Sequence, residues 1–211
     1  KRKQPVNYEG REYKDYLEYA KTHPFESTTE MDTLYNHQSG PYIQTFIFEN
    51  TSLMIGFLHQ EKTSISMAST LDKLQLLLED DYYTHFSLLL TDRGSEFEKY
   101  ELFENNIELN EARGHIFYCD PQRPDQKPHV ETNHNFVRNI LPNGTSLKNI
   151  SQDDLNLMFS HINSVPRGNL GGRTPYDVFT YFYGDTVLKK LGIQRIEKDM
   201  VTLKPYLLKI K

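Results

Sequence analysis

Two apolar, β-rich runs that almost touch constrain the fold of this chain more than any other feature. They are PYIQTFIFEN at 41–50 and SLMIGFLHQ at 52–60, and the polar residues Glu49, Asn50 and Thr51 join them. Runs of this composition with a short connection predict a β-hairpin. The hairpin is therefore the expected start of a sheet.

The patterns around the hairpin alternate between strand and helix. The segment 28–33 precedes it and indicates a strand, and HIFYC at 115–119 indicates another. FSLLLTD at 86–92 is apolar almost throughout, as in a strand buried on both faces. Helices are expected at 10–22, 96–103 and 124–140, and between the hairpin and 86–92. Three strands, helix, strand, helix, strand, helix is the order of a ribonuclease-H-like core, an α/β fold with a mixed five-stranded sheet flanked by helices.

The helix after the hairpin is the most clearly periodic of these. Ser64 or Thr63 is expected near its N-cap. One apolar face is predicted from the spacing of Ile65, Ala68, Leu71, Leu74, Gln75 and Leu78.

The chain is predicted to have three parts. A linker with a short helix occupies 1–27, the ribonuclease-H-like core occupies 28–145, and a helical C-terminal extension occupies 146–211. Ser151 with Asp154 gives a capping-box-like helix start in the extension, and Thr174-Pro175 gives a second. A last short helix is expected at 185–191.

Length and composition allow a soluble globular protein and exclude some other classes. The chain has 211 residues, of which 37% are hydrophobic and 25% charged, so it can bury a real core. No apolar run approaches the roughly 20 residues that span a bilayer, and no signal peptide is visible, so no membrane partner is expected. Cys119 is the only cysteine, which excludes an internal disulfide.

Asp92 stands at the end of the buried run 86–92 and is followed by Arg93-Gly94-Ser95. Such a residue lies at the carboxyl edge of a sheet, where the sites of α/β proteins are usually found. The alternative is a turn former or helix cap, and Asp92 alone does not decide between them.

Asp32 follows Glu30 by two positions, so both side chains are expected on one face of a strand. An acidic face turned to solvent is the simpler interpretation. Glu30 could be a spare ligand, but we assign it no role.

Glu131 lies in the predicted helix 124–140, and Asn135 and Arg138 follow it at i+4 and i+7. The three form one polar stripe, while Val130 and Val137 would face the core. The stripe is either solvated or lines a DNA groove with Arg138 on a phosphate.

Carboxylates brought together from different elements are what a pair of Mg²⁺ ions requires. Hard cations prefer oxygen ligands, and two metals about 3.5–4 Å apart can clamp the attacking and leaving oxygens of a phosphodiester. Asp32, Asp92 and Glu131 therefore point to phosphoryl transfer on a nucleic acid.

Other conspicuous residues have simpler interpretations. Cys119 is expected to be a small buried side chain and His134 a packed helix histidine, while Asp80 and Asp81 indicate a solvated helix end. No Walker loop, GxGxxG or GxSxG motif is present.

The formal net charge of −5 is unexpected for a protein that holds DNA, because neutralisation of phosphates supplies most non-specific affinity. Either the chain does not bind nucleic acid, or its main DNA-binding module lies outside this sequence. Basic residues do gather at the two ends, where they serve either as solvated tails or as a binding surface.

Several motifs, in order, resemble the integrase-like catalytic region of DDE transposases of the insertion-sequence-thirty type. They are EMDT at 30–33, TDRGSEF at 91–97 and FYCDPQRPDQKPHVETNHNFVRNILPNGTS at 117–146. SQDDLNLMFSHINSVPRGNLGGRTPYDVF at 151–179 and LKPYLLK at 203–209 are similar to the region that follows in that family. The resemblance extends from about residue 10 to the end.

The resemblance implies a retroviral-integrase-like fold with Asp32, Asp92 and Glu131 as a metal-binding triad. It implies two Mg²⁺ ions, replaceable by Mn²⁺, and transposon ends and target DNA as partners. It also implies a homo-oligomer on DNA, in the bacterial cytoplasm at the nucleoid. Members of the family carry helix-turn-helix modules before this region, which would explain the acidic balance. Arg93, Asn135 and Arg138 are the residues expected to contact DNA.

The chain departs from the family pattern at Arg93, where Asn is usual, at Pro128, where Gly is usual, and at Asn36, where Gly is common. Pro128 restricts the backbone just before the helix that carries Glu131, so we expect the departures to bear on activity.

The leading hypothesis is a metal-dependent polynucleotidyl transferase. Hydrolysis would free a transposon 3′-end, whose hydroxyl would then attack target DNA. A simple metal-dependent nuclease and an inactive domesticated core for DNA binding or oligomerisation are the alternatives. The terminal repeat, the target sequence and the stoichiometry cannot be read from the sequence.

Overall fold

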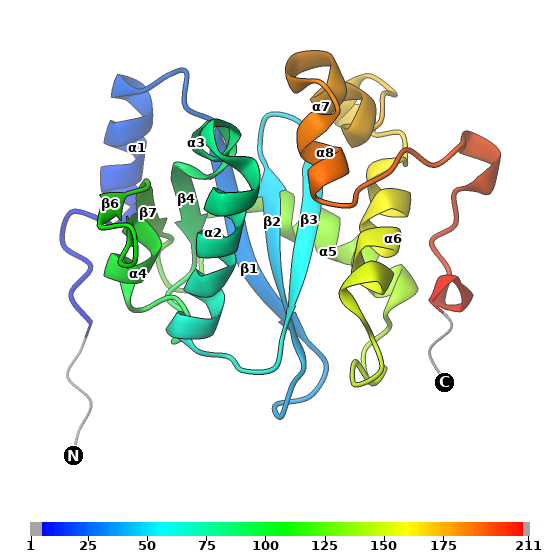
Figure 1. Ribbon diagram of the computed structural model, residues 1–211, viewed down its shortest axis with the longest axis horizontal. Coiled ribbons are helices and arrows are strands. Elements are labelled where there is room, and N and C mark those ends of the chain that lie inside the picture. Colours follow the sequence, from blue (N-terminus) through cyan, green and yellow to red (C-terminus); the bar gives the residue numbers. More distant parts are fainter. Residues whose placement is uncertain (1–5, 209–211) are drawn as a thin grey trace.

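The protein is built around a five-stranded mixed sheet with helices on both faces (Figure 1). The computed structural model describes residues 6–208, apart from the side chain of Glu131. The strand order is β3-β2-β1-β4-β7. The strands are β1 (Thr28–Tyr35), β2 (Tyr42–Phe48), β3 (Leu53–His59), β4 (Leu88–Thr91) and β7 (His115–Tyr118). β1, β2 and β3 are antiparallel neighbours, whereas β4 and β7 run parallel to β1.

Helices make up most of the rest of the chain. They are α1 (Tyr13–Thr22), α2 (Ser64–Leu78), α3 (Asp80–Phe86), α4 (Tyr100–Glu104), α5 (Pro128–Ile140), α6 (Gln152–Asn163), α7 (Pro175–Tyr183) and α8 (Thr186–Lys190). Short 3-10 turns lie at Pro124–Gln126, Gly168–Leu170, Lys198–Met200 and Pro205–Leu207, and β5 (Asn105–Asn106) pairs with β6 (Glu111–Ala112). No helix in the described range 6–208 is long and apolar enough to cross a membrane.

The predicted ribonuclease-H-like sheet and the hairpin are confirmed. All seven residues of β2 are buried, because strands flank it and helices cover both faces. The three leucines of β4 are also buried, because the sheet is covered on both faces, and this accounts for their apolar run. Leu88 and Leu90 pack with Tyr16 of α1, while Leu89 belongs to the main core on the other face.

α6 closes the β3 edge of the sheet through two amide side chains. Asn163 accepts from Met54 N–H at 2.9 Å and donates to Met54 C=O at 2.7 Å. Gln152 likewise accepts from the N–H of Leu58 at 3.1 Å and donates to the C=O of Gly56 at 2.8 Å. An edge covered in this way cannot recruit a further strand. The predicted capping box at the start of this helix is present.

Several predicted element boundaries were wrong. The strand expected over 86–92 is shorter, because Phe86 ends α3. Asp80 and Asp81 begin α3 instead of ending the preceding helix, after a backbone break at Glu79 with φ of 54°. Ile65, expected on the buried face of α2, is 66% exposed.

The helix predicted from Pro124 also starts later than expected. A 3-10 turn occupies Pro124–Gln126, and α5 begins at Pro128. Proline fits the first helical position, because its missing N–H has no helical partner there and its φ is already helical. Pro128 therefore starts the helix without distorting it.

Candidate functional site

The first two acidic residues of the predicted triad lie at the same edge of the sheet. β1 and β4 are adjacent parallel strands, and Glu30 of β1 pairs with Leu90 of β4. Asp32 and Asp92 each lie two positions beyond that pair. β4 ends at Thr91, so Asp92 leaves the sheet beside the continuing β1 strand. This is the carboxyl edge that the sequence predicted for Asp92.

The loop after β4 folds tightly around the Asp92 carboxylate. Gly94 N–H donates to Asp92 Oδ1 at 2.9 Å. A Cβ on Gly94 would lie 2.9 Å from that oxygen and 2.7 Å from Glu96 Oε2, so only glycine fits without movement. Asp92 is thus a turn former as well as a site candidate, and the two interpretations are compatible.

A buried lysine lies among these carboxylates. Lys127 Nζ is 3.4 Å from Asp32 Oδ2 and donates to the C=O of Met31 at 3.2 Å. Its side chain is 9% exposed. Because an ammonium is seldom buried without a charged partner, Lys127 marks this edge as strongly negative.

The surroundings of Asp92 raise the pKa of its carboxyl. One side of Asp92 is exposed to solvent, but the protein packed on its other side disfavours the charged form. The charge of Lys127 opposes this shift, and the negative charge of Asp32 adds to it. The negative charges of Asp32 and Asp92 would favour a cation bound at this edge.

Glu131, the third predicted residue, lies in the first turn of α5, and its side chain is outside the described residues. The start of α5 is nevertheless fixed against β1. Glu30 Oε2 accepts from Val130 N–H at 2.8 Å, and Glu30 Oε1 accepts from His129 N–H at 3.4 Å. The helix that carries Glu131 therefore starts on the strand that carries Asp32.

Glu30 is the residue that the sequence analysis missed. It is 2% exposed, so the expectation of a solvent-facing acidic strand was wrong at this position. Burial raises the pKa of Glu30 to about 7, while the Val130 N–H acts in the opposite direction. The period-two spacing from Asp32 was a signal, but nothing in the sequence paired Glu30 with a helix 100 positions away.

The histidine and the cysteine near the site are softer donors than the oxygen ligands that Mg²⁺ prefers. His134 is half-buried with Nε2 3.2 Å from Thr45 Oγ1, and burial lowers its pKa to about 4, which keeps the ring neutral near pH 7. Cys119 is buried, and burial raises the pKa of its thiol to about 12, so no thiolate is available near pH 7. Among the described side chains, no group of three or more His, Cys, Asp or Glu could hold a metal.

Arg138 holds the far end of α5 to β1. It donates to Asn36 Oδ1 and lies 3.5 Å from the C=O of Tyr35. Asn36 in turn donates to the C=O groups of Pro142 and Thr145. The departure from glycine at position 36 thus adds a side chain that fixes this corner.

The other two expected DNA contacts differ in their surroundings. Asn135 is exposed. Arg93 lies 3.6 Å from Glu12, 3.8 Å from Asp120 and over the ring of Tyr8, so it is drawn toward the N-terminal segment. Whether these side chains contact DNA remains a prediction.

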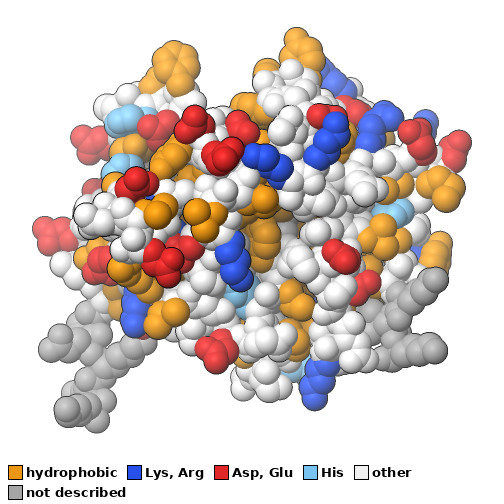
Figure 2. Space-filling model, viewed as in Figure 1, with side chains coloured by type: hydrophobic (Ala, Val, Ile, Leu, Met, Phe, Trp, Pro, Cys, Tyr) orange, Lys and Arg blue, Asp and Glu red, His pale blue; other side chains and the backbone are white. Residues whose placement is uncertain are grey.

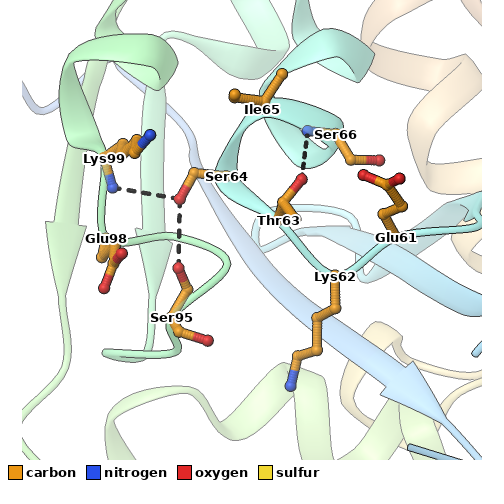
Figure 3. Close-up of a pocket in the computed structure, with 9 residues that line it drawn as sticks. All are labelled: Glu61, Lys62, Thr63, Ser64, Ile65, Ser66, Ser95, Glu98 and Lys99. Atoms are coloured by element: carbon orange, nitrogen blue, oxygen red, sulfur yellow. Dashed lines mark hydrogen bonds between the residues drawn. The ribbon is translucent and has the colours of Figure 1, made fainter. Parts of the chain in front are cut away.

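A cavity of about 510 Å³ lies next to the Asp92 loop, between the start of α2 and the residues after β4 (Figure 3). Ser64 Oγ joins the two sides, since it donates to Ser95 C=O at 3.3 Å and accepts from Lys99 N–H at 3.4 Å. Lys62 extends away from Ser64 and reaches the buried Glu96 at 3.1 Å. The walls are Glu61, Lys62, Thr63, Ser64, Ile65, Ser66, Ser95, Glu98 and Lys99.

The visible face of the molecule shows no dominant basic surface. Most acidic side chains lie in the left half of the view, and the Lys and Arg side chains are scattered among other types (Figure 2). This distribution agrees with the net charge of −5.

Comparisons with known proteins relate the chain to transposases. Over 91 residues, 43% of this chain, it is 32% identical to the transposase for insertion sequence element IS1086 of Cupriavidus metallidurans and 30% identical to transposase InsI for IS30A of Escherichia coli K12. A putative integrase, ORF3 of Spiroplasma virus SpV1-R8A2 B, is 29% identical over a segment of the same length. The matches cover 25%, 22% and 27% of these relatives, so the chain corresponds to a minor part of each. No family model matches the chain.

Solved structures support the fold. The catalytic core domain of BIV integrase superposes with a TM-score of 0.50 at 20% identity, over 74% of this chain and 94% of that domain. A simian T-cell lymphotropic virus intasome, solved in complex with PP2A regulatory subunit B56 gamma, gives a TM-score of 0.52 at 16% identity, over 72% of this chain and 53% of its own. The chain therefore shares the fold of integrase catalytic cores, and 43% of its length is similar in sequence to IS30-like transposases.

Proposed function

We propose that this chain is the catalytic domain of a DNA transposase that cleaves phosphodiesters at transposon ends and joins the 3′-hydroxyl to target DNA. The domain would consist of the core at 28–145 with the helical extension at 146–211. Asp32, Asp92 and Glu131 would be its catalytic carboxylates. Because the chain matches only about a quarter of its relatives' length, the activity of the whole protein belongs to this proposal.

The observation that carries the proposal is the convergence of three elements at one sheet edge. Asp32 and Asp92 lie beyond paired residues of adjacent parallel strands, and α5 starts on the same strand as Asp32. Lys127 Nζ lies 3.4 Å from Asp32 and its charge acts on Asp92. Such an arrangement is suited to concentrating positive charge at one point.

The donor set fits Mg²⁺ better than a softer metal. The available ligands are carboxylate oxygens, which Mg²⁺ prefers, whereas Cys119 is protonated and His134 is occupied by Thr45. Glu96 Oε2 is a further buried carboxylate oxygen near Asp92 that has no partner among the described residues. Two Mg²⁺ ions held by the triad would supply the charge that stabilises the attacking and leaving oxygens.

The protein's own residues would orient the site and exclude alternatives. The Gly94 N–H holds one oxygen of Asp92, and Thr33 N–H holds Asp32 Oδ1 at 2.7 Å while Lys127 faces Asp32 Oδ2, so both carboxylates are oriented by the protein. Arg93, Asn135 and Arg138 would bind the DNA backbone, which fixes position without reading sequence. A homo-oligomer assembled on DNA and action on bacterial DNA in the cytoplasm complete the proposal.

Strand transfer tests this function. The transposase with its full N-terminal region would be supplied with a donor duplex that carries a free 3′-hydroxyl, with target plasmid and with Mg²⁺ or Mn²⁺. Joined products should form with the wild type and fall at least about 10³-fold with Asp92→Asn or Glu131→Gln. Asp153→Asn changes an exposed carboxylate in the first turn of α6 and should leave joining unchanged.

The same assay separates the alternatives. Cleavage without joined products would indicate a simple nuclease. Neither cleavage nor joining, with duplex binding intact, would indicate an inactive core. Wild-type joining by the Asp92→Asn protein would contradict the site assignment.

A further inference from the structure

We infer that Glu30 is a positioning residue: its carboxylate caps the first turn of α5 from the neighbouring strand and so sets the place of Glu131 relative to Asp32. The inference rests on the proposed function and adds a residue that the triad does not contain. Both Glu30 oxygens are bonded to the α5 backbone, so Glu30 acts through the helix.

The cap is needed because α5 begins without one of its own. The first N–H groups of any helix lack intrahelical partners. Pro128 has no N–H, and Lys127, at the N-cap position, makes no side-chain capping bond. The N–H groups of His129 and Val130 are bonded instead by the two oxygens of Glu30, at 3.4 and 2.8 Å.

Lys127 cannot serve as the cap because an ammonium has no acceptor for the helix N–H groups. A serine, threonine or aspartate is the usual residue at such a position. Here the position carries an ammonium that lies on Asp32 and on the C=O of Met31. The N-cap position thus carries a cation, and the cap is supplied by Glu30 of β1, 100 positions before Val130.

The cap joins two parts of the proposed site. Glu30 and Asp32 are two residues apart on β1, and Val130 immediately precedes Glu131. A shift of the α5 start along β1 would move Glu131 relative to Asp32. At the other end of α5, Arg138 is held by Asn36 and Tyr35. The helix is therefore fixed to one strand at both ends, and metal sites depend on such outer contacts.

A role for Glu30 as a metal ligand fits the geometry less well. Both of its oxygens accept from the α5 backbone, and the residue is 2% exposed. Burying a carboxylate is unfavourable unless it is hydrogen-bonded, and these two N–H groups provide those bonds. To bind a metal, Glu30 would have to release the helix.

Three variants test the inference. Glu30→Gln keeps the size and one acceptor oxygen, and Glu30→Met keeps the approximate volume but removes both acceptors. Glu49→Gln is the matched control. Glu49 Oε1 is 4.0 Å from the His129 ring, so it places a carboxylate near the same helix start, but it is exposed and makes no bond to the described α5 backbone.

Each variant would be studied by amide hydrogen exchange at Val130 and by Mn²⁺ calorimetry, with and without a donor duplex, well below the melting temperature. We expect Val130 exchange to accelerate and the Mn²⁺ dissociation constant to rise about 10-fold or more, with Glu30→Met more affected than Glu30→Gln. Glu49→Gln should match the wild type in both.

The outcomes that overturn the inference are distinct. Unchanged Val130 exchange in Glu30→Met would show that Glu30 does not cap the helix. Faster exchange with unchanged Mn²⁺ affinity would make the cap purely structural, while lost binding with unchanged exchange would make Glu30 a ligand. A wild type that binds no Mn²⁺ in either condition would refute the proposed metal site itself, and the wild-type titration alone identifies that case.

Discussion

Buried polar groups at the proposed site and under α2 differ in how fully they are hydrogen-bonded. Beneath α2, His59 Nδ1 is 2.8 Å from Ser66 Oγ, and its Nε2 is 3.0 Å from both Gln44 Oε1 and Thr70 Oγ1. Both ring nitrogens therefore have partners, and burial lowers the pKa of His59 to about 4, which keeps the ring neutral.

Beside Asp92 at the proposed site, by contrast, the buried Glu96 Oε2 has no hydrogen-bond partner among the described residues. Buried polar atoms are nearly always bonded, so each unbonded one needs an explanation. The difference indicates that the His59 cluster stabilises the fold, whereas the site edge is arranged for a ligand at some expense of stability.

The largest expected effect separates activity from stability at Asp92. Asp92→Asn should lower strand transfer at least about 10³-fold. Because the fold raises the pKa of Asp92, its charged form is disfavoured in the native state, and the neutral amide should leave the melting temperature equal or higher. Thermal melting of both proteins checks the second part. A clear loss of stability would show that Asp92 is a structural residue and would break the comparison.

The pH dependence of stability tests the buried histidines. Burial lowers the pKa of His59 and of His85 to about 4, against about 6.5 in the unfolded chain. The unfolded histidines therefore bind protons first as pH falls, so the free energy of unfolding should decrease between about pH 7 and pH 4. Each would contribute up to about 3 kcal/mol to that decrease.

Urea unfolding across this pH range measures the slope. His59→Gln combined with His85→Phe should reduce it and leave the part that His134 contributes, and His37→Gln, at an exposed position, should leave it unchanged. A double variant with the wild-type slope would mean that other groups control the acid sensitivity.

Breaking the His59 network should reduce stability without reaching the site. His59→Ala leaves Gln44, Ser66 and Thr70 without a buried partner and should lower the free energy of unfolding by about 2–3 kcal/mol. Mn²⁺ affinity of the folded protein should not change. A parallel loss of Mn²⁺ binding would show that the two regions are coupled.

The smallest expected effect concerns the buried lysine. Lys127→Met removes a cation that competes with a metal for Asp32, so Mn²⁺ should bind roughly 3- to 10-fold more tightly. Without the metal, the chain should lose about 1 kcal/mol of stability, because Asp32 and Asp92 would then face each other without a counter-charge. Calorimetry and urea unfolding measure the two quantities, with Lys99→Met as the control at an exposed position. Weaker Mn²⁺ binding in Lys127→Met would instead make Lys127 part of the productive site.

The sequence was sufficient for the sheet and for the position of two acidic residues. Period-two and fully apolar runs report burial directly, so β2, β3 and β4 were predictable, as was the edge position of Asp92. Helix boundaries were less predictable because they do not depend on hydrophobic periodicity alone. Pro128 at the first helical position and the contact of Lys127 with Asp32 both bear on where α5 begins, and the apolar spacing reports neither. Ile65 fits the α2 stripe by spacing but lies at the exposed first turn.

Glu30 shows where sequence reasoning ends. An acidic residue in a strand is usually solvated, and only the approach of α5 makes this one a buried cap. The pairing links residues 100 positions apart, and no local pattern encodes it.

Mn²⁺ calorimetry on the wild type, Asp92→Ala and Glu131→Ala, each with and without a donor duplex, tests whether these carboxylates form a metal site. We expect wild-type binding that is lost in both variants while their melting temperatures stay near that of the wild type. Equal binding by all three proteins, or no wild-type binding even with the duplex, would contradict a metal site formed by these carboxylates.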